Sequence, residues 1–84
     1  MTTAEYEGWS NRETWNTELW ISNTEPLYKL IMRIMNSSTN DFADNLEAFL
    51  WIIWDGFTPD GLSLKPVDWV QIAMAWHEAY PNDP

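Results

Sequence analysis

The sequence predicts an all-α fold, a compact bundle of about four short helices. Three observations predict it. Apolar residues recur at the spacing of one helix face in several segments, residues that cap helices precede those segments, and Pro or Gly follows them. The 84 residues have room for one domain. We therefore expect a single helical domain over residues 1–84, with an N-terminal arm at 1–8 and a frayed tail at 81–84.

The first expected helix covers residues 11–22. Ser10 and Glu13 have the S-x-x-E spacing of a capping box, in which the Ser10 side chain accepts a hydrogen bond from the backbone N–H of Glu13. Trp15 and Leu19 lie one turn apart on one face of this helix, and we expect both in the core. The residues expected to point outward are Glu13, Asn16 and Thr17.

The second expected helix covers residues 25–36. Pro26 is tolerated in the first turn of a helix, and Asn23 or Thr24 can cap it. Its apolar stripe consists of Leu27, Leu30, Ile31, Ile34 and Met35. Residues at this spacing share one side of a helix, so we expect that side to face the core.

The third expected helix covers residues 41–55 and follows a polar loop, of which Thr39 or Asn40 is the expected cap. Its stripe consists of Phe42, Leu46, Phe49, Leu50 and Ile53. From Phe49 to Trp54 the helix is apolar all round, which indicates burial on more than one side. Either this is the central helix of the bundle, or its second half forms an interface.

The fourth expected helix follows a connection rich in turn residues. Asp55 and Gly56 end the third helix, and residues 58–61 have Pro and Gly at the positions that a β-turn favours. Pro66 then opens the fourth helix, with Asp68 in the first turn, where the helix dipole favours negative charge. The expected buried stripe is Trp69, Ile72, Ala73, Trp76 and Tyr80.

Two sequence blocks carry a resemblance to a known family. Residues 8–16 read Gly-Trp-Ser-Asn-Arg-Glu-Thr-Trp-Asn, and residues 67–73 read Val-Asp-Trp-Val-Gln-Ile-Ala. The first block resembles the W-[ST]-N-x-E-T-W opening of small uncharacterised proteins of bacteria, plasmids and phages. The second is similar to the V-[DN]-W-x-x-I-A segment that closes many of them. The resemblance implies a mobile-element origin and no particular chemistry.

Charge is the strongest global signal in the sequence. Thirteen Asp and Glu residues stand against four Lys and Arg residues, which gives a net charge of −9. This balance disfavours direct binding to nucleic acid or to a membrane, and it favours a host protein with a basic surface. The alternative is that the charge serves only solubility. The sequence shows no leader and no apolar run long enough for a membrane span, so we expect the protein in the cytoplasm of the host cell.

The sequence contains no catalytic or metal-binding pattern. It has no Cys and a single His, His77, and it lacks a phosphate-binding loop, a dinucleotide fingerprint and a nucleophile elbow. We therefore expect no catalytic residue, no metal, no cofactor and no enzyme activity. His77 has no carboxylate one helical turn before it, so we expect it to be exposed or to bond a helix end.

Two hypotheses of function remain, and both are forms of protein binding. In the first, carboxylates imitate the phosphates of nucleic acid and occupy a basic groove of a host defence or DNA-handling protein, which requires one continuous acidic face. These residues are Glu13, Glu18, Glu25, Asp41, Asp44 and Glu47. In the second, exposed tryptophans anchor a partner or a second copy of the chain, as in a homodimer or a small adaptor. These residues are Trp20, Trp51 and Trp54.

Overall fold

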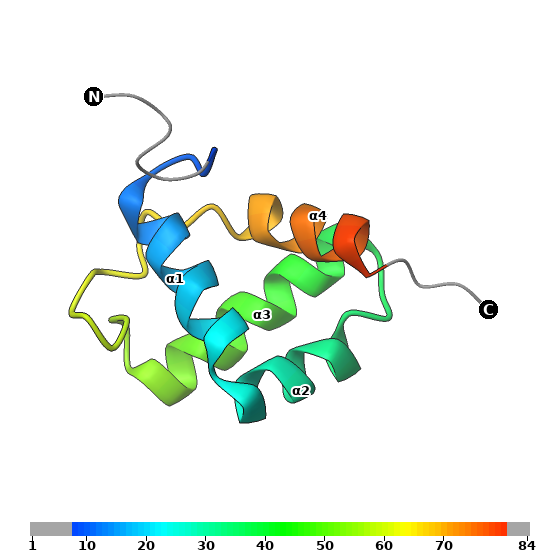
Figure 1. Ribbon diagram of the computed structural model, residues 1–84, viewed down its shortest axis with the longest axis horizontal. Coiled ribbons are helices and arrows are strands. Elements are labelled where there is room, and N and C mark those ends of the chain that lie inside the picture. The colour runs from blue at the N-terminus through cyan, green and yellow to red at the C-terminus, as the bar shows by residue number, and fades with distance from the viewer. Residues whose placement is uncertain (1–7, 81–84) are drawn as a thin grey trace.

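Four helices form within residues 8–80, the part of the chain that the computed structural model describes (Figure 1). They are α1 (Arg12–Asn23), α2 (Glu25–Ile34), α3 (Thr39–Trp54) and α4 (Trp69–Ala79). Within these residues no strand forms, and Phe57 and Ser63 make an isolated bridge before α4. The all-α prediction is confirmed. The expected arm, apart from Gly8, and the expected tail lie outside the described residues.

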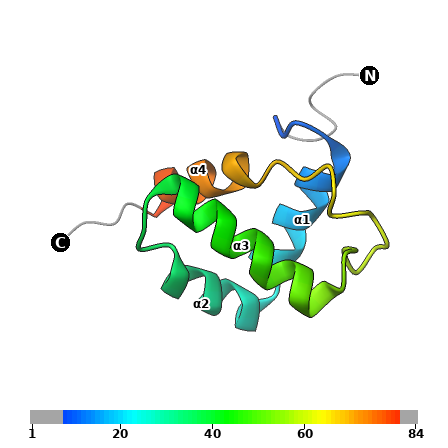
Figure 2. The same ribbon diagram turned by 180° about the vertical axis from the view of Figure 1, so that it is seen from behind.

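Helix α3 lies at the centre of the arrangement. It packs most extensively against α4 and also against α2, and these two helices flank it (Figure 1). Helix α1 crosses in front of α3 in Figure 1 and lies behind it in Figure 2, so these two helices occupy opposite faces of the molecule. α1 packs against α2 and α4. Of the two interpretations of the third helix, a central position agrees with this arrangement only for the inner side of α3, because Asp41, Ala48 and Ile52 on its outer side are exposed.

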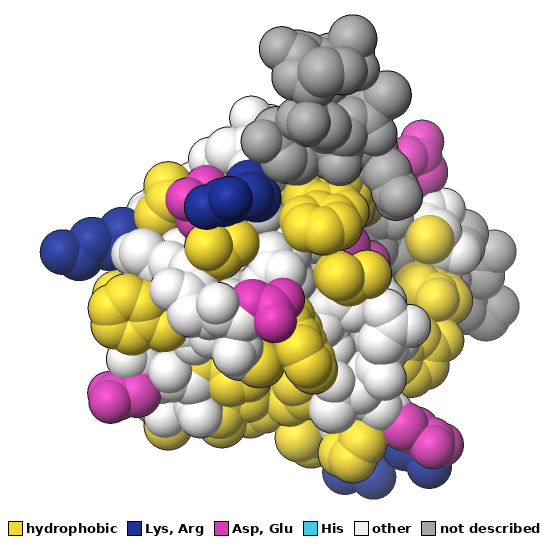
Figure 3. Space-filling view, turned by 60° about the vertical axis from the view of Figure 1, so that its left-hand side comes forward, with side chains coloured by type: hydrophobic (Ala, Val, Ile, Leu, Met, Phe, Trp, Pro, Cys, Tyr) yellow, Lys and Arg dark blue, Asp and Glu magenta, His cyan; other side chains and the backbone are white. Residues whose placement is uncertain are grey.

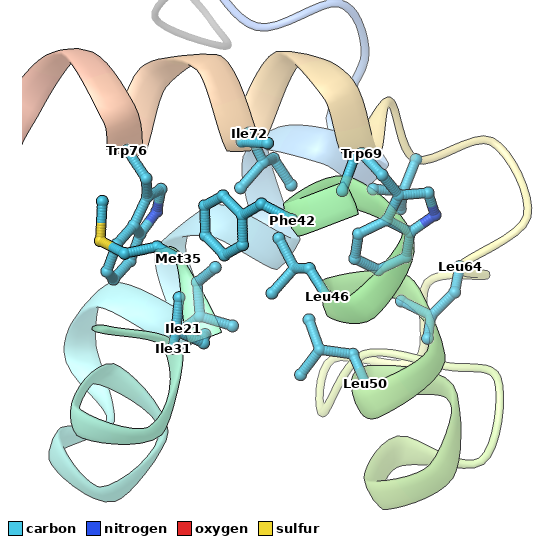
Figure 4. Close-up of a cluster of buried hydrophobic side chains, with 13 residues drawn as sticks. Ile21, Ile31, Met35, Phe42, Leu46, Leu50, Leu64, Trp69, Ile72 and Trp76 are labelled. Carbon is cyan, nitrogen blue, oxygen red and sulfur yellow. The ribbon is translucent and has the colours of Figure 1, made fainter. Parts of the chain in front are cut away.

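The core consists of apolar side chains from all four helices and from the connection before α4 (Figure 4). Phe42, Leu46 and Leu50 of α3 are fully buried, and so are Ile21 of α1 and Ile31 of α2. The other labelled members are Met35, Leu64, Trp69, Ile72 and Trp76. Fully burying a side chain of this kind stabilises a fold by about 1.5–3 kcal/mol. This cluster is therefore the main favourable term in the stability of the domain.

Helix α1 buries a different face from the expected one. Its buried residues are Thr14, Asn16, Thr17 and Ile21. Leu19 is 40% exposed, and Trp15 is only half-buried. The prediction that the side of Trp15 and Leu19 faces the core is therefore wrong.

The buried face of α1 is polar because its side chains bond to distant parts of the chain. Asn16 Nδ2 donates to Asp60 Oδ2 at 2.8 Å, and Thr14 Oγ1 accepts from the backbone N–H of Asp68 at 2.9 Å. A buried polar group without a partner costs about 1–3 kcal/mol, whereas a bonded one does not. The bond to Asp60 explains why Asn16 points inward instead of outward. Thr17 is also buried, but its Oγ1 atom has no hydrogen-bond partner among the described residues.

Two helices, α1 and α3, are capped by other residues than the expected ones, whereas the residue at the start of α2 is Thr24, as expected, although its side chain makes no cap bond. Asn11 caps α1, because its Oδ1 atom accepts from the backbone N–H of Thr14 at 2.8 Å. Ser38, one residue before the expected caps, caps α3, because its Oγ atom accepts from the backbone N–H of Asp41 at 3.2 Å. The predicted Ser10 cap is wrong, since Ser10 bonds to α4 instead. Asn and Ser cap about equally well, so neighbouring polar residues compete for this position.

The predicted stop of α3 is confirmed. Asp55 and Gly56 follow its last residue with φ angles of 55° and 90°. A Cβ atom at Gly56 would lie 2.9 Å from the ring of Trp51. Gly is therefore required there both for its backbone conformation and for its small size.

The connection to α4 contains the predicted β-turn, but the helix begins later than expected. The N–H of Gly61 donates to the carbonyl of Thr58 at 2.8 Å and closes the turn. Asp68, rather than a residue before Pro66, precedes the first turn of α4 and caps it by accepting from the Gln71 N–H at 3.0 Å. The first residue of α4 is thus the buried Trp69.

Candidate interaction surfaces

The two sequence blocks that carry the resemblance lie against each other. Ser10 donates to Oε1 of Gln71 from its backbone N–H at 2.9 Å, and its hydroxyl lies 2.8 Å from the same atom. Gln71 Nε2 donates to the carbonyl of Gly8 at 3.2 Å. The segment before α1 is thereby fixed to the first turn of α4.

Asn11 and Thr14 extend this contact. Asn11 Nδ2 donates to the carbonyl of Pro66 at 2.8 Å. Thr14 Oγ1 donates to Asn11 Oδ1 at 2.6 Å and accepts the bond from the Asp68 backbone. We call the bonds between residues 8–14 and 66–71 the clasp. They give five polar residues of the two blocks a structural role that the sequence blocks alone did not reveal: Ser10, Asn11, Thr14, Asp68 and Gln71.

Asp60, in the β-turn before α4, joins that connection to α1. Its Oδ2 atom accepts from Asn16 Nδ2 at 2.8 Å and from Trp20 Nε1 at 2.9 Å. These bonds, above all the one from Asn16, hold the pKa of Asp60 below its ordinary value of 3.8. Trp20 is half-buried, and its indole N–H is occupied by this bond. Sequence reasoning missed Asp60 because its partners are 44 and 40 positions away.

The carboxylates of the acidic hypothesis are divided between the faces of the molecule. Glu13 and Glu18 are half-buried on α1, Glu25 is exposed at the start of α2, and Asp41, Asp44 and Glu47 are exposed on α3. Since α1 and α3 occupy opposite faces, the structure brings together the last three, which we call the α3 acid row. On the face in Figure 3, acidic side chains stand apart from one another, some of them beside Lys or Arg.

Glu18 differs from the other carboxylates because it faces α4. Its Oε1 atom accepts from Trp76 Nε1 at 2.7 Å, and its Oε2 atom accepts from the hydroxyl of Ser22. Burial raises the pKa of Glu18 above its ordinary value of 4.5, although the bonds from Ser22 and Trp76 act in the opposite direction. Two hollows of about 240 and 170 Å³ are both lined by Glu18 and Ser22. We call these hollows, with the carboxylate between them, the Glu18 pocket.

An apolar area lies at the C-terminal end of α3. Ile52 is 79% exposed, Phe57 55% and Ile53 42%, and we call these three residues the α3-end patch. Trp51 and Trp54, expected to be exposed anchors, are half-buried beside it. The expectation that this half of α3 is buried on more than one side is therefore wrong for Ile52 and Ile53 within the chain. The alternative, an interface, stays a prediction.

Two further residues of the expected core stripes are exposed. Leu30 of α2 lines a hollow of about 130 Å³ between α2 and α3, together with Ile34, Asn45 and Phe49, and no described segment covers it. Tyr80 follows the last residue of α4, where the helix no longer packs against the core, and its ring contacts Trp76 with centroids 5.4 Å apart. Helical periodicity alone predicted burial for both residues and could not show where neighbouring segments end.

His77 forms a hydrogen bond to a helix end, which was one of the two roles expected for it from the sequence. Its Nε2 atom lies 2.8 Å from the carbonyl of Met35, the residue that ends α2, and its Nδ1 atom lies 3.0 Å from the hydroxyl of Thr39. A carbonyl can only accept, so Nε2 donates to Met35. The ring also stacks on Phe42 at 5.2 Å. His77 therefore ties α4 to the loop between α2 and α3.

A wide hollow of about 570 Å³ runs along the outer side of α4. Its lining includes Gln71 and His77, whose polar side-chain atoms are already used in the clasp and in the bonds to Met35 and Thr39. Residues 8–80 contain no group of three or more His, Cys, Asp or Glu side chains that could hold a metal ion. None of the helices in this range combines the length and apolar character needed to cross a membrane.

The fold and these surfaces define a small four-helix domain that is closed by the clasp and exposes an acidic row and an apolar patch on α3. The chain belongs to the family of unknown function DUF7249, which matches residues 2–80. The match includes the segment between the two blocks, to which the resemblance assigned nothing. No curated protein and no solved structure matches the chain.

Proposed function

We propose that this domain binds another protein, has no catalytic activity of its own, and uses the outer side of α3 as its contact surface. The observation that carries the proposal is the exposure of Ile52, at 79%, beside the other two residues of the α3-end patch. Single exposed apolar residues are ordinary, whereas neighbouring ones at the end of an apolar helix mark an interaction area. The half-buried rings of Trp51 and Trp54 border this area and would lose their remaining water contact in a complex.

The acidic and apolar residues of α3 follow each other on one side of the helix. Asp41, Ala48 and Ile52 are separated by seven and four positions, a spacing that aligns side chains, and all three are exposed. The N-terminal half of this side is acidic and its C-terminal half is apolar. A partner that covers both halves needs apolar side chains next to basic ones. The net charge of −9 favours the same kind of partner and disfavours nucleic acid and anionic membranes.

Nucleic-acid mimicry is a second candidate function. It would use only the three carboxylates of the α3 acid row rather than all six expected ones. The α3 acid row supports it, because its exposed carboxylates follow each other every three residues, about 4.5 Å apart along the helix axis. A basic host protein for defence or DNA handling would then be the target, and the mobile-element origin that the sequence blocks imply would fit such an inhibitor. The division of the other carboxylates between α1 and α2 favours the apolar contact as the larger contribution.

The test compares matched variants of the two halves of α3. The tagged domain captures proteins from a nuclease-treated bacterial lysate at low and at high salt, with Ile52→Ser as the apolar variant and Asp44→Asn with Glu47→Gln as the acidic variant. We expect Ile52→Ser to abolish capture at both salt concentrations and the acidic variant to weaken capture only at low salt, where surface charges are less screened. Capture that survives Ile52→Ser but disappears at high salt would instead support mimicry.

Self-association is measured separately by sedimentation of the purified domain. A dimer that Ile52→Ser converts to monomer would identify a second copy of the chain as the partner. A monomer at all concentrations, together with no capture from the lysate, would contradict the proposal.

A further inference from the structure

Glu18 is a half-buried carboxylate without a cationic partner in the described part of the chain. All four Lys and Arg residues are described, and none of them forms an ion pair with Glu18; the ion pair among residues 8–80 joins Lys29 to Glu25. Taking an ionised carboxylate out of water is costly, and its usual compensation is a nearby positive charge. The two hydrogen bonds from Trp76 and Ser22 supply only part of that compensation.

The surroundings of Glu18 have the chemistry of a cation site. Each carboxylate oxygen accepts one hydrogen bond and has a further lone pair. Rings line both hollows of the Glu18 pocket: Trp9 and Trp15 line the first, and Trp76 and Tyr80 line the second. The faces of aromatic rings attract ammonium and guanidinium groups, and do so more strongly where water is partly excluded.

The second hollow is built around a compact aromatic group. The ring centroids of Tyr28, Trp76 and Tyr80 are 5.4–5.9 Å apart, so these rings hold one another in place. Hollows of about 240 and 170 Å³ are several times larger than the ~30 Å³ that one water occupies in the liquid. There is room for an alkylammonium or guanidinium head group beside the carboxylate.

We propose that the Glu18 pocket binds an alkylammonium or alkylguanidinium group, the chemistry of a Lys or Arg side chain. The group lies in the second hollow, where the carboxylate forms the ion pair and the rings of Trp76 and Tyr80 flank the alkyl part, while Ser22 orients Glu18. This site lies between α1 and α4, away from the outer side of α3, and it does not depend on the surface proposed above. It separates Glu18 from the other five carboxylates of the acidic hypothesis and gives this residue a specific ligand.

The test follows the indole resonance of Trp76 by ¹H–¹⁵N NMR, because its N–H is bonded to the carboxylate. The probes are n-butylammonium chloride and ethylguanidinium chloride, with sodium chloride at equal ionic strength as the reference. The variant is Glu18→Gln, which keeps a hydrogen-bond acceptor for Trp76 but removes the charge. The matched control is Glu47→Gln, which removes one exposed carboxylate of α3.

We expect a saturable shift of the Trp76 resonance in the wild type and in Glu47→Gln, and binding at least tenfold weaker in Glu18→Gln. Equal binding in Glu18→Gln and the wild type, or no shift beyond that caused by sodium chloride, would overturn the proposal. To find the source of the group, the same titration uses N-acetyl-Gly-Lys-Gly-amide and its Arg and norleucine counterparts. Tighter binding of the Lys or Arg peptide than of the free cations would indicate a protein partner, and the reverse a small amine. An equal shift with the norleucine peptide would overturn the proposal.

A second measurement keeps the test informative if Glu18→Gln does not fold. Binding to the wild type should weaken as the pH falls through the raised pKa of Glu18, because protonation removes the charge of the carboxylate. Among the residues that line the two hollows, the titratable group besides Glu18 is Tyr80. Its hydrogen bond with Tyr28 raises its pKa above the ordinary value of 10.0, so Tyr80 stays neutral over this range. Binding that does not change between pH 7 and pH 4 would contradict an ion pair with Glu18.

Discussion

Helices α1 and α3 lie on opposite faces of the same small domain and are held in it by different forces. The buried side of α3 is apolar, with Phe42, Leu46 and Leu50 fully enclosed. The buried side of α1 contains Thr14, Asn16 and Thr17, and only Ile21 joins the apolar core. Hydrophobic burial fixes α3, whereas directional bonds to residues far along the chain fix α1. Apolar periodicity therefore predicts the orientation of the first kind of helix and not of the second.

The same difference determines which side chains of α1 and α3 are exposed to solvent. Because polar groups occupy the buried side of α1, Trp15, Glu18 and Leu19 are displaced toward the surface, where they line one hollow of the Glu18 pocket. Helix α3 buries its apolar stripe and leaves acidic residues outside, followed by Ile52 at its end. The Glu18 pocket and the outer side of α3 thus both consist of residues that are not buried when these two helices pack.

The largest effect is expected from the apolar side of α3. Phe42→Ala should lower the free energy of unfolding by about 3–5 kcal/mol, because it removes a fully buried ring and leaves a cavity. Urea unfolding followed by tryptophan fluorescence measures this change. Phe57→Ala, at an exposed ring of the same type, is the matched control and should cost much less. Similar losses in both variants would show that Phe42 is not the core residue described here.

A smaller effect is expected from the polar side of α1. Thr14→Val keeps the shape of the side chain but removes the acceptor of the Asp68 N–H, and should cost about 1–3 kcal/mol. The same urea measurement applies. Thr24→Val is the matched control, since Thr24 makes no side-chain cap bond at the start of α2. A neutral Thr14→Val variant would mean that α1 is held by apolar contacts after all.

A still smaller effect should appear as a pH dependence of stability through Glu18. Its pKa is raised in the folded state, so protonation favours folding: the contribution is fully present below the ordinary value of 4.5 and is lost as the pH rises through the raised pKa. The difference in unfolding free energy between the wild type and Glu18→Gln should therefore increase in favour of the wild type as the pH falls from 7 toward 4.5. A difference that is constant with pH would contradict the burial of this carboxylate.

Asp60 should give a pH dependence of stability with the opposite sign to that of Glu18. Its pKa is lowered by the bonds from Asn16 and Trp20, so its contribution is present above the ordinary value of 3.8 and is lost as the pH falls through the lowered pKa. The stability difference between the wild type and Asp60→Asn should accordingly shrink on acidification below 3.8. Unfolding curves of the two variants across the same pH series would show whether the trends diverge; parallel trends would argue against the bonds from Asn16 and Trp20.

The smallest effect on stability is expected at the outer side of α3. Ile52→Ser should change the free energy of unfolding by no more than about 0.5 kcal/mol, because the side chain is mostly in water. Thermal unfolding of this variant is the check. A large loss of stability would show that Ile52 supports the fold. Loss of capture by this variant could then be due to unfolding rather than to a missing contact.

Much of the fold could be predicted from local signals. The stripes of α2, α3 and α4 identified Ile31, Phe42 and Trp76 as core residues, and the Asp55–Gly56 stop of α3 followed from the conformations those residues allow. These signals act between residues within a few positions of each other. Helix starts shifted by a few residues because several neighbouring polar residues can serve as caps.

The candidate sites could be predicted only in part, because they depend on contacts between distant positions. The sequence identified Glu18 as one acid among six, and only the bond from Trp76, 58 positions away, distinguishes it. Trp20 is half-buried because Asp60 accepts from its indole N–H. Exposure of Ile52 likewise depends on where α2 and the connection before α4 run, which no periodicity describes.

The clasp has a consequence for the order of folding. Its bonds join residues that are 54 to 63 positions apart, so nearly the whole domain must be synthesised before the segment that begins α1 meets its partners. Contacts of such sequence separation form late, because closing a long loop costs entropy before any bond compensates for it. The neighbouring helices α3 and α4, by contrast, can pair early through their apolar sides. We therefore expect the clasp, which holds the start of α1 against α4, to form last during folding and to open first, while α1 can pack against the neighbouring α2 earlier.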